Sequence, residues 1–123
     1  MEVALNIPDD VPPGPLPPDH PVNRQLAAYN AHRLDEFVAC FASTIRLTTG
    51  NGTIRAEGHE QLRVAYVPVF AIVGRRATIL NRIAVGDWVV DHERIDDDSG
   101  RQFEAAVAFH LTDGEIDEMR MLD

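Results

Sequence analysis

Apolar residues recur with two different periods along this chain. Between residues 22 and 41 they stand at positions 22, 26, 29, 34, 37, 38 and 41, the period of a helix that buries one face. The phase slips around residues 30–33, so we expect two helices joined by a short bend. Ile45 and Leu47 then alternate with polar residues, and Gly50-Asn51-Gly52 predicts the turn of a hairpin.

A third helix is expected from about Glu57 or His59 to Ile72, and Pro68 should kink or shorten it. Its apolar face is expected to carry Leu62, Tyr66 and Phe70. Four strands should follow, over residues 77–86, 87–96, 101–112 and 115–123. Asp113-Gly114 is typical of the tight turns that join antiparallel neighbours. This order predicts an α+β fold with three N-terminal helices on one face of a curved, mainly antiparallel sheet.

Composition predicts one folded domain and an extended arm. The chain has 123 residues, 45% of them hydrophobic, which suffices for a single core. Residues 8–21 hold seven of the eight prolines, so we divide the chain into a proline-rich arm, 1–21, and a domain, 22–123.

Charge and motifs exclude several classes of function. The formal net charge of −9 argues against nucleic-acid and membrane partners, because both require a clustered basic surface. No signal peptide or membrane span is apparent, so we expect a cytoplasmic protein. The single cysteine, Cys40, excludes an internal disulfide, and the histidines show no metal-ligand spacing. We therefore expect neither a cofactor nor a metal.

Four segments together resemble a known family: AAYNAHRLDEFVACFA, GHEQLRVAY, DHERID and LTDGEIDEMRML. They are similar to the SnoaL-like branch of the nuclear transport factor two-like superfamily, and the resemblance spans Val22 to Asp123. It implies a cone-shaped, ketosteroid isomerase-like (cystatin-like) fold, a pocket for a small molecule, and a homodimer. Ketosteroid isomerases, polyketide cyclases and limonene-epoxide hydrolases share this scaffold, which hosts unrelated chemistries.

The resemblance also implies site positions. The base, the oxyanion-hole tyrosine and the protonated acid of ketosteroid isomerases fall at Thr49, Gln25 and Val107, so that mechanism is not expected here. The arginine and the first aspartate of the epoxide hydrolases match Arg94 and Asp96. Their second aspartate falls at Met121, and their tyrosine and asparagine fall at Thr48 and Gly50.

The strand around DHERID carries the candidate chemistry. Strand alternation places His92, Arg94 and Asp96 on one face, and the resemblance implies that this face lines the pocket. There Asp96 could act as a base, Arg94 as its orienting group or an anion clamp, and His92 as a proton donor. The alternative is a structural ion pair of Arg94 with Asp96 and a hydrogen-bonded His92.

The remaining pocket candidates are mostly apolar and describe a site for a small hydrophobic or carboxylate-bearing ligand. They are Tyr29, Thr49, Tyr66, Phe70, Trp88, Val107, Phe109, Met119 and Met121. The first functional hypothesis is an acid/base hydrolase, isomerase or cyclase. The second is a non-catalytic binding or dimeric assembly domain with a filled pocket, and the third is an accessory subunit regulated through the proline-rich arm.

Overall fold

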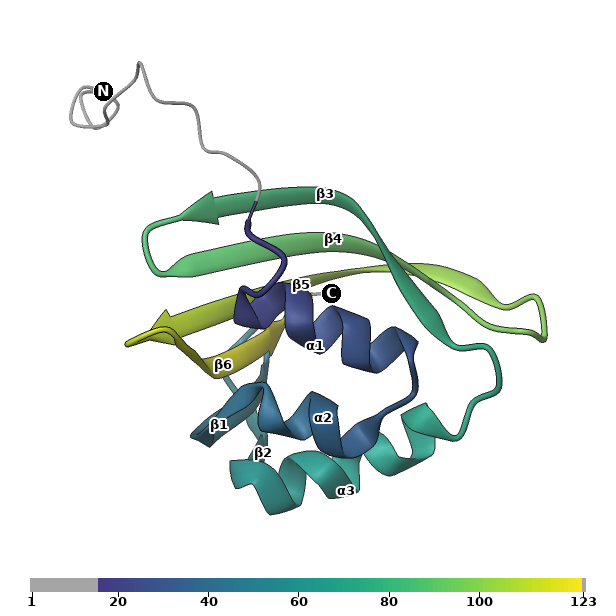
Figure 1. The fold of residues 1–123 in the computed structure, drawn as a ribbon, viewed down its shortest axis with the longest axis horizontal. Coiled ribbons are helices and arrows are strands. Elements are labelled where there is room, and N and C mark those ends of the chain that lie inside the picture. Colours follow the sequence, from purple (N-terminus) through teal and green to yellow (C-terminus); the bar gives the residue numbers. More distant parts are fainter. Residues whose placement is uncertain (1–15, 123) are drawn as a thin grey trace.

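The computed structural model describes residues 16–122, which form three helices and one six-stranded sheet (Figure 1). In chain order the elements are α1 (Pro21–Asn30), α2 (Leu34–Ala39), β1 (Phe41–Thr49), β2 (Ile54–Glu57), α3 (Gly58–Phe70), β3 (Arg76–Val85), β4 (Trp88–Asp96), β5 (Gln102–Thr112) and β6 (Glu115–Met121). The predicted α+β class is confirmed. Most of the predicted arm, residues 1–15, lies outside the described residues, and residues 16–20 lead through a turn into α1.

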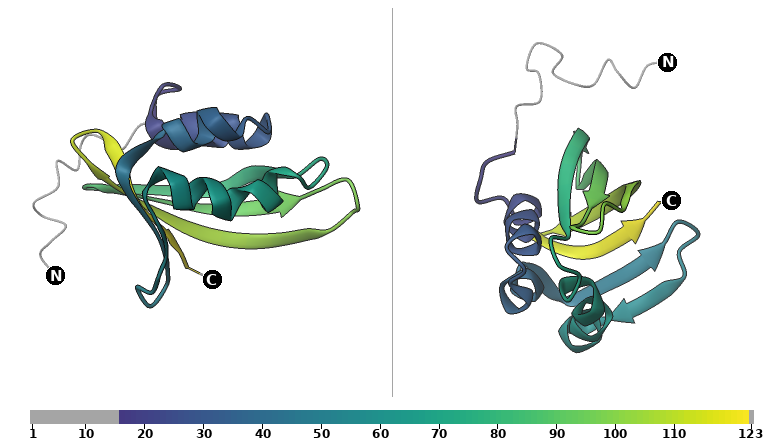
Figure 2. Two further views of the ribbon diagram at one scale, coloured as in Figure 1. Left: turned by 90° about the horizontal axis from the view of Figure 1, so that it is seen from below. Right: turned by 90° about the vertical axis from the view of Figure 1, so that its right-hand side faces the viewer.

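The sheet has the strand order β2-β1-β6-β5-β4-β3. The four strands from β3 to β6 form an antiparallel meander, as predicted, and β1 joins it parallel to β6. The pairing shifts register between Ile79 and Asn81 and between His110 and Leu111, and such irregularities bend strands. The curved sheet therefore presents a concave inner face, and all three helices lie on that side (Figure 2).

Local signals explain where the first two helices begin and end. The side chain of His20 accepts a hydrogen bond from the backbone N–H of Val22 at 3.1 Å, and Pro21 occupies the first turn of α1. After α1 the chain turns at His32, whose φ of 57° is left-handed. The predicted bend at residues 30–33 is thus confirmed. The imidazole Nε2 of His32 lies 2.7 Å from the carbonyl oxygen of Arg75, which ties this bend to the loop after α3.

Helix α3 continues through Pro68 and ends two residues later at Phe70. Proline has no N–H to donate to the carbonyl four residues earlier, which here belongs to Val64. Val64 is 67% exposed, so water can hydrogen-bond that carbonyl. This explains why the proline near the end of the helix is tolerated.

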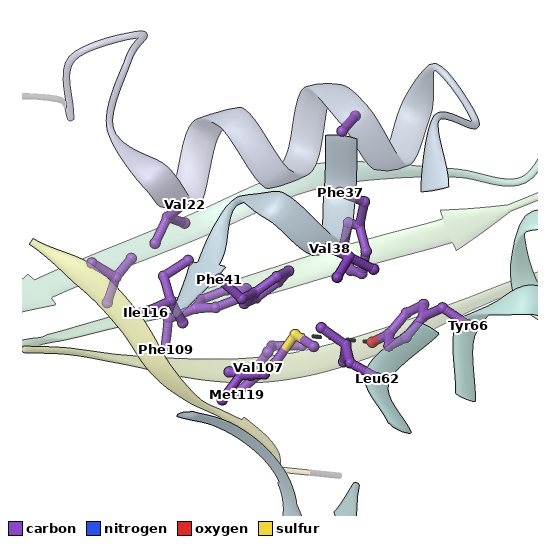
Figure 3. Close-up of a cluster of buried hydrophobic side chains, with 13 residues drawn as sticks. Val22, Phe37, Val38, Phe41, Leu62, Tyr66, Val107, Phe109, Ile116 and Met119 are labelled. Atoms are coloured by element: carbon purple, nitrogen blue, oxygen red, sulfur yellow. Dashed lines mark hydrogen bonds between the residues drawn. The ribbon is translucent and has the colours of Figure 1, made fainter. Parts of the chain in front are cut away.

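An aromatic cluster forms the centre of the core (Figure 3). The ring of Phe37, which is 1% exposed, lies 5.0 Å from that of Phe41, 4.8 Å from that of Tyr66 and 5.2 Å from that of Phe70. These rings come from α2, β1 and α3, so their packing holds the helices against the sheet. Among the described residues, no helix is long and apolar enough to cross a membrane.

Candidate active site

Helices α1 and α3, the loop after α3 and the inner face of the sheet line a cavity of about 300 Å³. Most of its wall is apolar, which suits a small organic ligand. The polar lining residues come from different elements: Gln25 and Tyr29 from α1, Tyr66 from α3, Arg75 from the α3–β3 loop, and Glu93 from β4.

Six of the predicted pocket residues line this cavity: Tyr29, Tyr66, Val107, Phe109, Met119 and Met121. The other three lie elsewhere. Phe70 packs edge-on against Tyr29, with the ring centroids 5.6 Å apart. Thr49 hydrogen-bonds to Asn51 in the β1–β2 turn. Trp88 packs against the imidazole of His110, outside the cavity, with the ring centroids 4.8 Å apart.

Glu93 is the only carboxylate among the described residues that line the cavity. Glu93 is 8% exposed, and no described residue donates a hydrogen bond to its carboxyl group. Burial raises the pKa of Glu93 to about 7, the carboxylate of Asp91 adds to the rise, and Arg82 opposes it. At neutral pH the cavity therefore holds a carboxyl group that is present in both protonation states.

Asp91, the next inward residue on β4, is fully buried but paired. Arg82 of β3 contacts both of its carboxylate oxygens, with Nε 2.6 Å from Oδ1 and Nη2 2.8 Å from Oδ2. The remaining guanidinium nitrogen, Nη1, donates to the side-chain oxygen of Asn23 on α1 at 2.7 Å. This forked contact pairs the Asp91 carboxylate with a guanidinium, and the negative charge of Asp91 disfavours a second one on Glu93.

Arg75 places a positive charge in the cavity wall. The residue is 9% exposed, and its Nε is buried without a hydrogen-bond acceptor among the described residues. Its guanidinium carbon lies 5.6 Å from the centre of the Phe103 ring. The preceding Gly74 has a φ of 74°, and an added Cβ there would collide with the carboxylate of Asp98. The left-handed φ favours glycine where the α3–β3 loop passes the β4–β5 loop, directly before Arg75.

Two tyrosine hydroxyls complete the polar lining. Burial raises the pKa of Tyr29, and the nearby Arg75 guanidinium opposes that rise. The Tyr66 hydroxyl donates to the sulfur of Met119 at 3.9 Å (Figure 3), and burial raises the pKa of Tyr66 as well. Both phenols therefore stay protonated near neutral pH. The Tyr29 hydroxyl can donate a hydrogen bond to a ligand oxygen, and the Tyr66 hydroxyl can do so if it gives up its weak bond to Met119.

His92, Arg94 and Asp96 lie on the outer face of the sheet, and none of them lines the cavity. The expected orientation of this strand was wrong by one residue: Asp91, Glu93 and Ile95 point inward. The reason lies in β5, where an apolar row faces the helices. In the antiparallel register Ile95 pairs with Phe103 and Glu93 pairs with Ala105, so these β4 residues share its inner face.

The outward residues form a partly exposed polar network. The imidazole of His92 lies 3.0 Å from the amide nitrogen of Asn81 and 2.7 Å from a carboxylate oxygen of Glu104. The Nε of Arg94 lies 3.8 Å from a carboxylate oxygen of Asp96, which is a long contact, and the Nε of Arg76 lies 3.3 Å from the other oxygen. These contacts match the alternative in which the residues have a structural role. Within residues 16–122 no cluster of potential ligands could hold a metal ion.

The family model of the SnoaL-like domain matches residues 22–119. The chain belongs to the SnoaL-like family. No curated protein sequence matches it.

Solved structures agree with this SnoaL-like fold. An uncharacterised cystatin-fold protein from Novosphingobium aromaticivorans has a TM-score of 0.76 at 19% identity, covering 84% of this chain and 95% of that one. A putative polyketide cyclase from Sinorhizobium meliloti has a TM-score of 0.72 at 19% identity, covering 86% and 94%. A hypothetical protein with a ketosteroid isomerase-like fold from Catenulispora acidiphila, in complex with trimethylamine, has a TM-score of 0.67 at 17% identity, covering 84% of each chain. At these identities the likeness shows the fold alone.

In this SnoaL-like chain the inward acid stands at a position that the family comparison did not indicate. Gln25 and Val107 line the cavity, so two of the positions carried over from ketosteroid isomerases do face it, without ionisable groups. Thr49 does not face it. Glu93 supplies a carboxyl group from the central part of β4, across the cavity from the helices. The cavity thus combines a carboxyl group that can accept or donate a proton, two phenol hydroxyls and a guanidinium in apolar surroundings. Groups of these kinds can carry out acid/base chemistry.

Proposed function

We propose that the protein is an acid/base enzyme that moves a proton on a small, mainly apolar molecule bound in the cavity. Glu93 takes or gives the proton, and Tyr29 or Tyr66 donates a hydrogen bond to an oxygen on which negative charge develops. This proposal replaces Asp96 with Glu93 as the base. One observation carries it: an unpartnered carboxyl group in an apolar cavity with a pKa of about 7.

A pKa near the operating pH suits a group that must both accept and release a proton. An ordinary glutamate would be fully ionised and weakly basic at pH 7, whereas the rise to about 7 makes Glu93 a stronger base without removing its ionised form. The relatives described as a putative polyketide cyclase and as a complex with trimethylamine support a small organic molecule as the occupant.

The proposal can be tested with 5-nitrobenzisoxazole, a flat probe whose isoxazole ring opens when a base removes the C–H proton of that ring. The carboxylate accepts that proton, the C–H electron pair forms the nitrile, and the N–O bond breaks to give a coloured phenolate. We expect the wild-type rate to rise with pH around a midpoint near 7, because only ionised Glu93 is a base. Glu93→Gln should lower the rate by about 10² to 10⁴, the usual contribution of a positioned base.

The matched control is Asp96→Asn, which removes a carboxylate from the outer face of the same strand. It should leave the rate within about twofold, since its side chain does not reach the cavity. Unchanged ring opening in Glu93→Gln, or an equal loss in Asp96→Asn, would show that the proposal is wrong.

A non-catalytic binding domain is the second candidate. Its version with a pocket filled by side chains finds less support, since the cavity measures about 300 Å³. A cavity that binds the probe without opening its ring would favour the binding domain. The homodimer and the cytoplasmic location stay predictions.

A further inference from the structure

We propose that the natural ligand of the cavity is a small, mainly apolar molecule with one anionic head group, a carboxylate or an enolate, which Arg75 binds. The inference rests on the proposed function in one respect: it names the substrate class on which Glu93 would act.

The positive charge of Arg75 has no counter-charge among the described residues. No carboxylate within residues 16–122 lies at ion-pair distance from its guanidinium, although the residue is 9% exposed and lines the cavity. Hydrogen bonds from Ser99 lower the pKa of Asp97, and the charge of Arg75 adds to this lowering, but Asp97 lies at the surface of the β4–β5 loop and forms no ion pair with Arg75. Burying a charged group without a partner is costly, so such groups are normally paired. The Tyr29 hydroxyl interacts with Arg75, which opposes the rise in the pKa of Tyr29, but this hydroxyl is neutral, so a bound anion would supply the missing negative charge.

The other arginine of the inner face behaves differently. Arg82 donates hydrogen bonds from Nε and Nη2 to Asp91 and from Nη1 to Asn23, so each of its guanidinium nitrogens already has a partner. Arg94 also has a buried, unpartnered Nε, but its guanidinium lies near Asp96 on the outer face. Arg75 is therefore the guanidinium that both lines the cavity and lacks a carboxylate within the described residues.

The surroundings of Arg75 suit an anionic group attached to an apolar body. Its guanidinium lies over the Phe103 ring, with 5.6 Å between the guanidinium carbon and the ring centre. A guanidinium can bind a carboxylate through two parallel hydrogen bonds. The rest of the wall offers aromatic rings and methionine side chains for an apolar body: Phe37, Phe109, Met119 and Met121.

Arg75 and Glu93 line the same cavity. Burial raises the pKa of Tyr29, Arg75 opposes that rise and Glu93 adds to it, so the Tyr29 hydroxyl is close to both charges. An anionic head at Arg75 would thus place the attached carbon skeleton in the cavity that Glu93 and Tyr29 also line. Arg75 would also stabilise negative charge that develops as Glu93 removes a proton.

Two probes of equal shape test this inference: 2-naphthoate and its neutral analogue 2-naphthamide. Titration calorimetry at pH 7 would measure their dissociation constants with the full-length protein. We expect 2-naphthoate to bind the wild type at least about tenfold more tightly than 2-naphthamide, and Arg75→Met to remove that preference. The affinity for 2-naphthamide should change less than about threefold.

Arg101→Met is the matched control. The Arg101 guanidinium carbon lies 5.0 Å from the centre of the same Phe103 ring, but the residue is exposed and does not line the cavity. It should bind 2-naphthoate as the wild type does. Should Arg75→Met fail to fold, Arg75→Lys keeps the charge and loses the fork, and we expect a reduced preference for 2-naphthoate.

Equal wild-type affinities for the two probes, no binding of either, or an equal loss in Arg75→Met and Arg101→Met would each overturn the inference. Glu93→Gln separates it from the proposed function. If that variant still opens 5-nitrobenzisoxazole while 2-naphthoate binding depends on Arg75, the acid/base proposal fails and the anion site stands. If ring opening depends on Glu93 while 2-naphthoate does not bind, the reverse holds.

Discussion

The two faces of β4 carry similar charged residues in different surroundings. On the outer face Asp96 lies near Arg76 and Arg94, and its side chain is 25% exposed. On the inner face Asp91 is fully buried and bound by a forked arginine, and Glu93 is buried without a partner. Neighbouring residues of one strand thus differ in chemistry because of burial and pairing, whereas the residue type alone does not distinguish them.

Removing the acid of each pair should expose the largest difference between the two faces. Asp91→Asn leaves the guanidinium of Arg82 without its carboxylate in a site where only 20% of that side chain is exposed. We expect it to lower the free energy of unfolding by about 4 kcal/mol, as for other broken buried pairs. Asp96→Asn should cost about 1 kcal/mol or less, because exposed pairs contribute little. Urea unfolding at pH 7 measures both, and equal losses would remove the distinction between the faces.

Glu93→Gln should show a pH-dependent gain in stability. The folded pKa of about 7 lies above the ordinary glutamate value of 4.5, so between these values the folded state holds a proton that the unfolded state has lost. Stability contributed by this group therefore falls as pH rises from about 4.5 to 7. The variant should equal the wild type near pH 4.5 and exceed it by about 3 kcal/mol above pH 7.

The comparison of the two unfolding curves at several pH values cancels the titration of all other groups. Asp96→Asn, measured over the same range, controls for the loss of one carboxylate from this strand. A difference between Glu93→Gln and the wild type that stays constant with pH would contradict the raised pKa.

The smallest effect is expected for His92→Gln. Its imidazole joins Asn81 and Glu104 on the outer face, where 39% of the His92 side chain and 63% of the Glu104 side chain are exposed. We expect a loss of about 0.5 kcal/mol or less and an unchanged rate with 5-nitrobenzisoxazole. A tenfold loss of rate would contradict this expectation and show that His92 takes part in the reaction.

Periodicity predicted the helices, the strands and the fold class, because the apolar positions of most elements belong clearly to one face. Strand β4 is the exception, since valines stand at both 89 and 90 and charged residues occupy both faces. The neighbouring strand held the missing signal: its large apolar residues Phe103, Val107 and Phe109 all fall on one face, whereas the other face carries Glu104, alanines and His110. Pairing them across the loop of residues 97–101 assigns Glu93 to the inner face.

Arg75 could not be identified in the same way. It lies in the loop between α3 and β3, where no period applies, and a second arginine follows it directly. Its inward position depends on the left-handed Gly74 and on the contact of its carbonyl with His32, which lies 43 residues away in the chain. Contacts of this kind become visible only once the fold brings distant segments together.

The most direct test of the central claim is a ¹³C NMR titration of the side-chain carboxyl carbons of the unliganded protein, with Glu93→Gln used to assign the Glu93 signal. We expect a midpoint near pH 7 for that carbon. A midpoint below about 5, the range of an ordinary glutamate, would show that the cavity does not hold a carboxyl group prepared for proton transfer, and the proposed chemistry would be wrong.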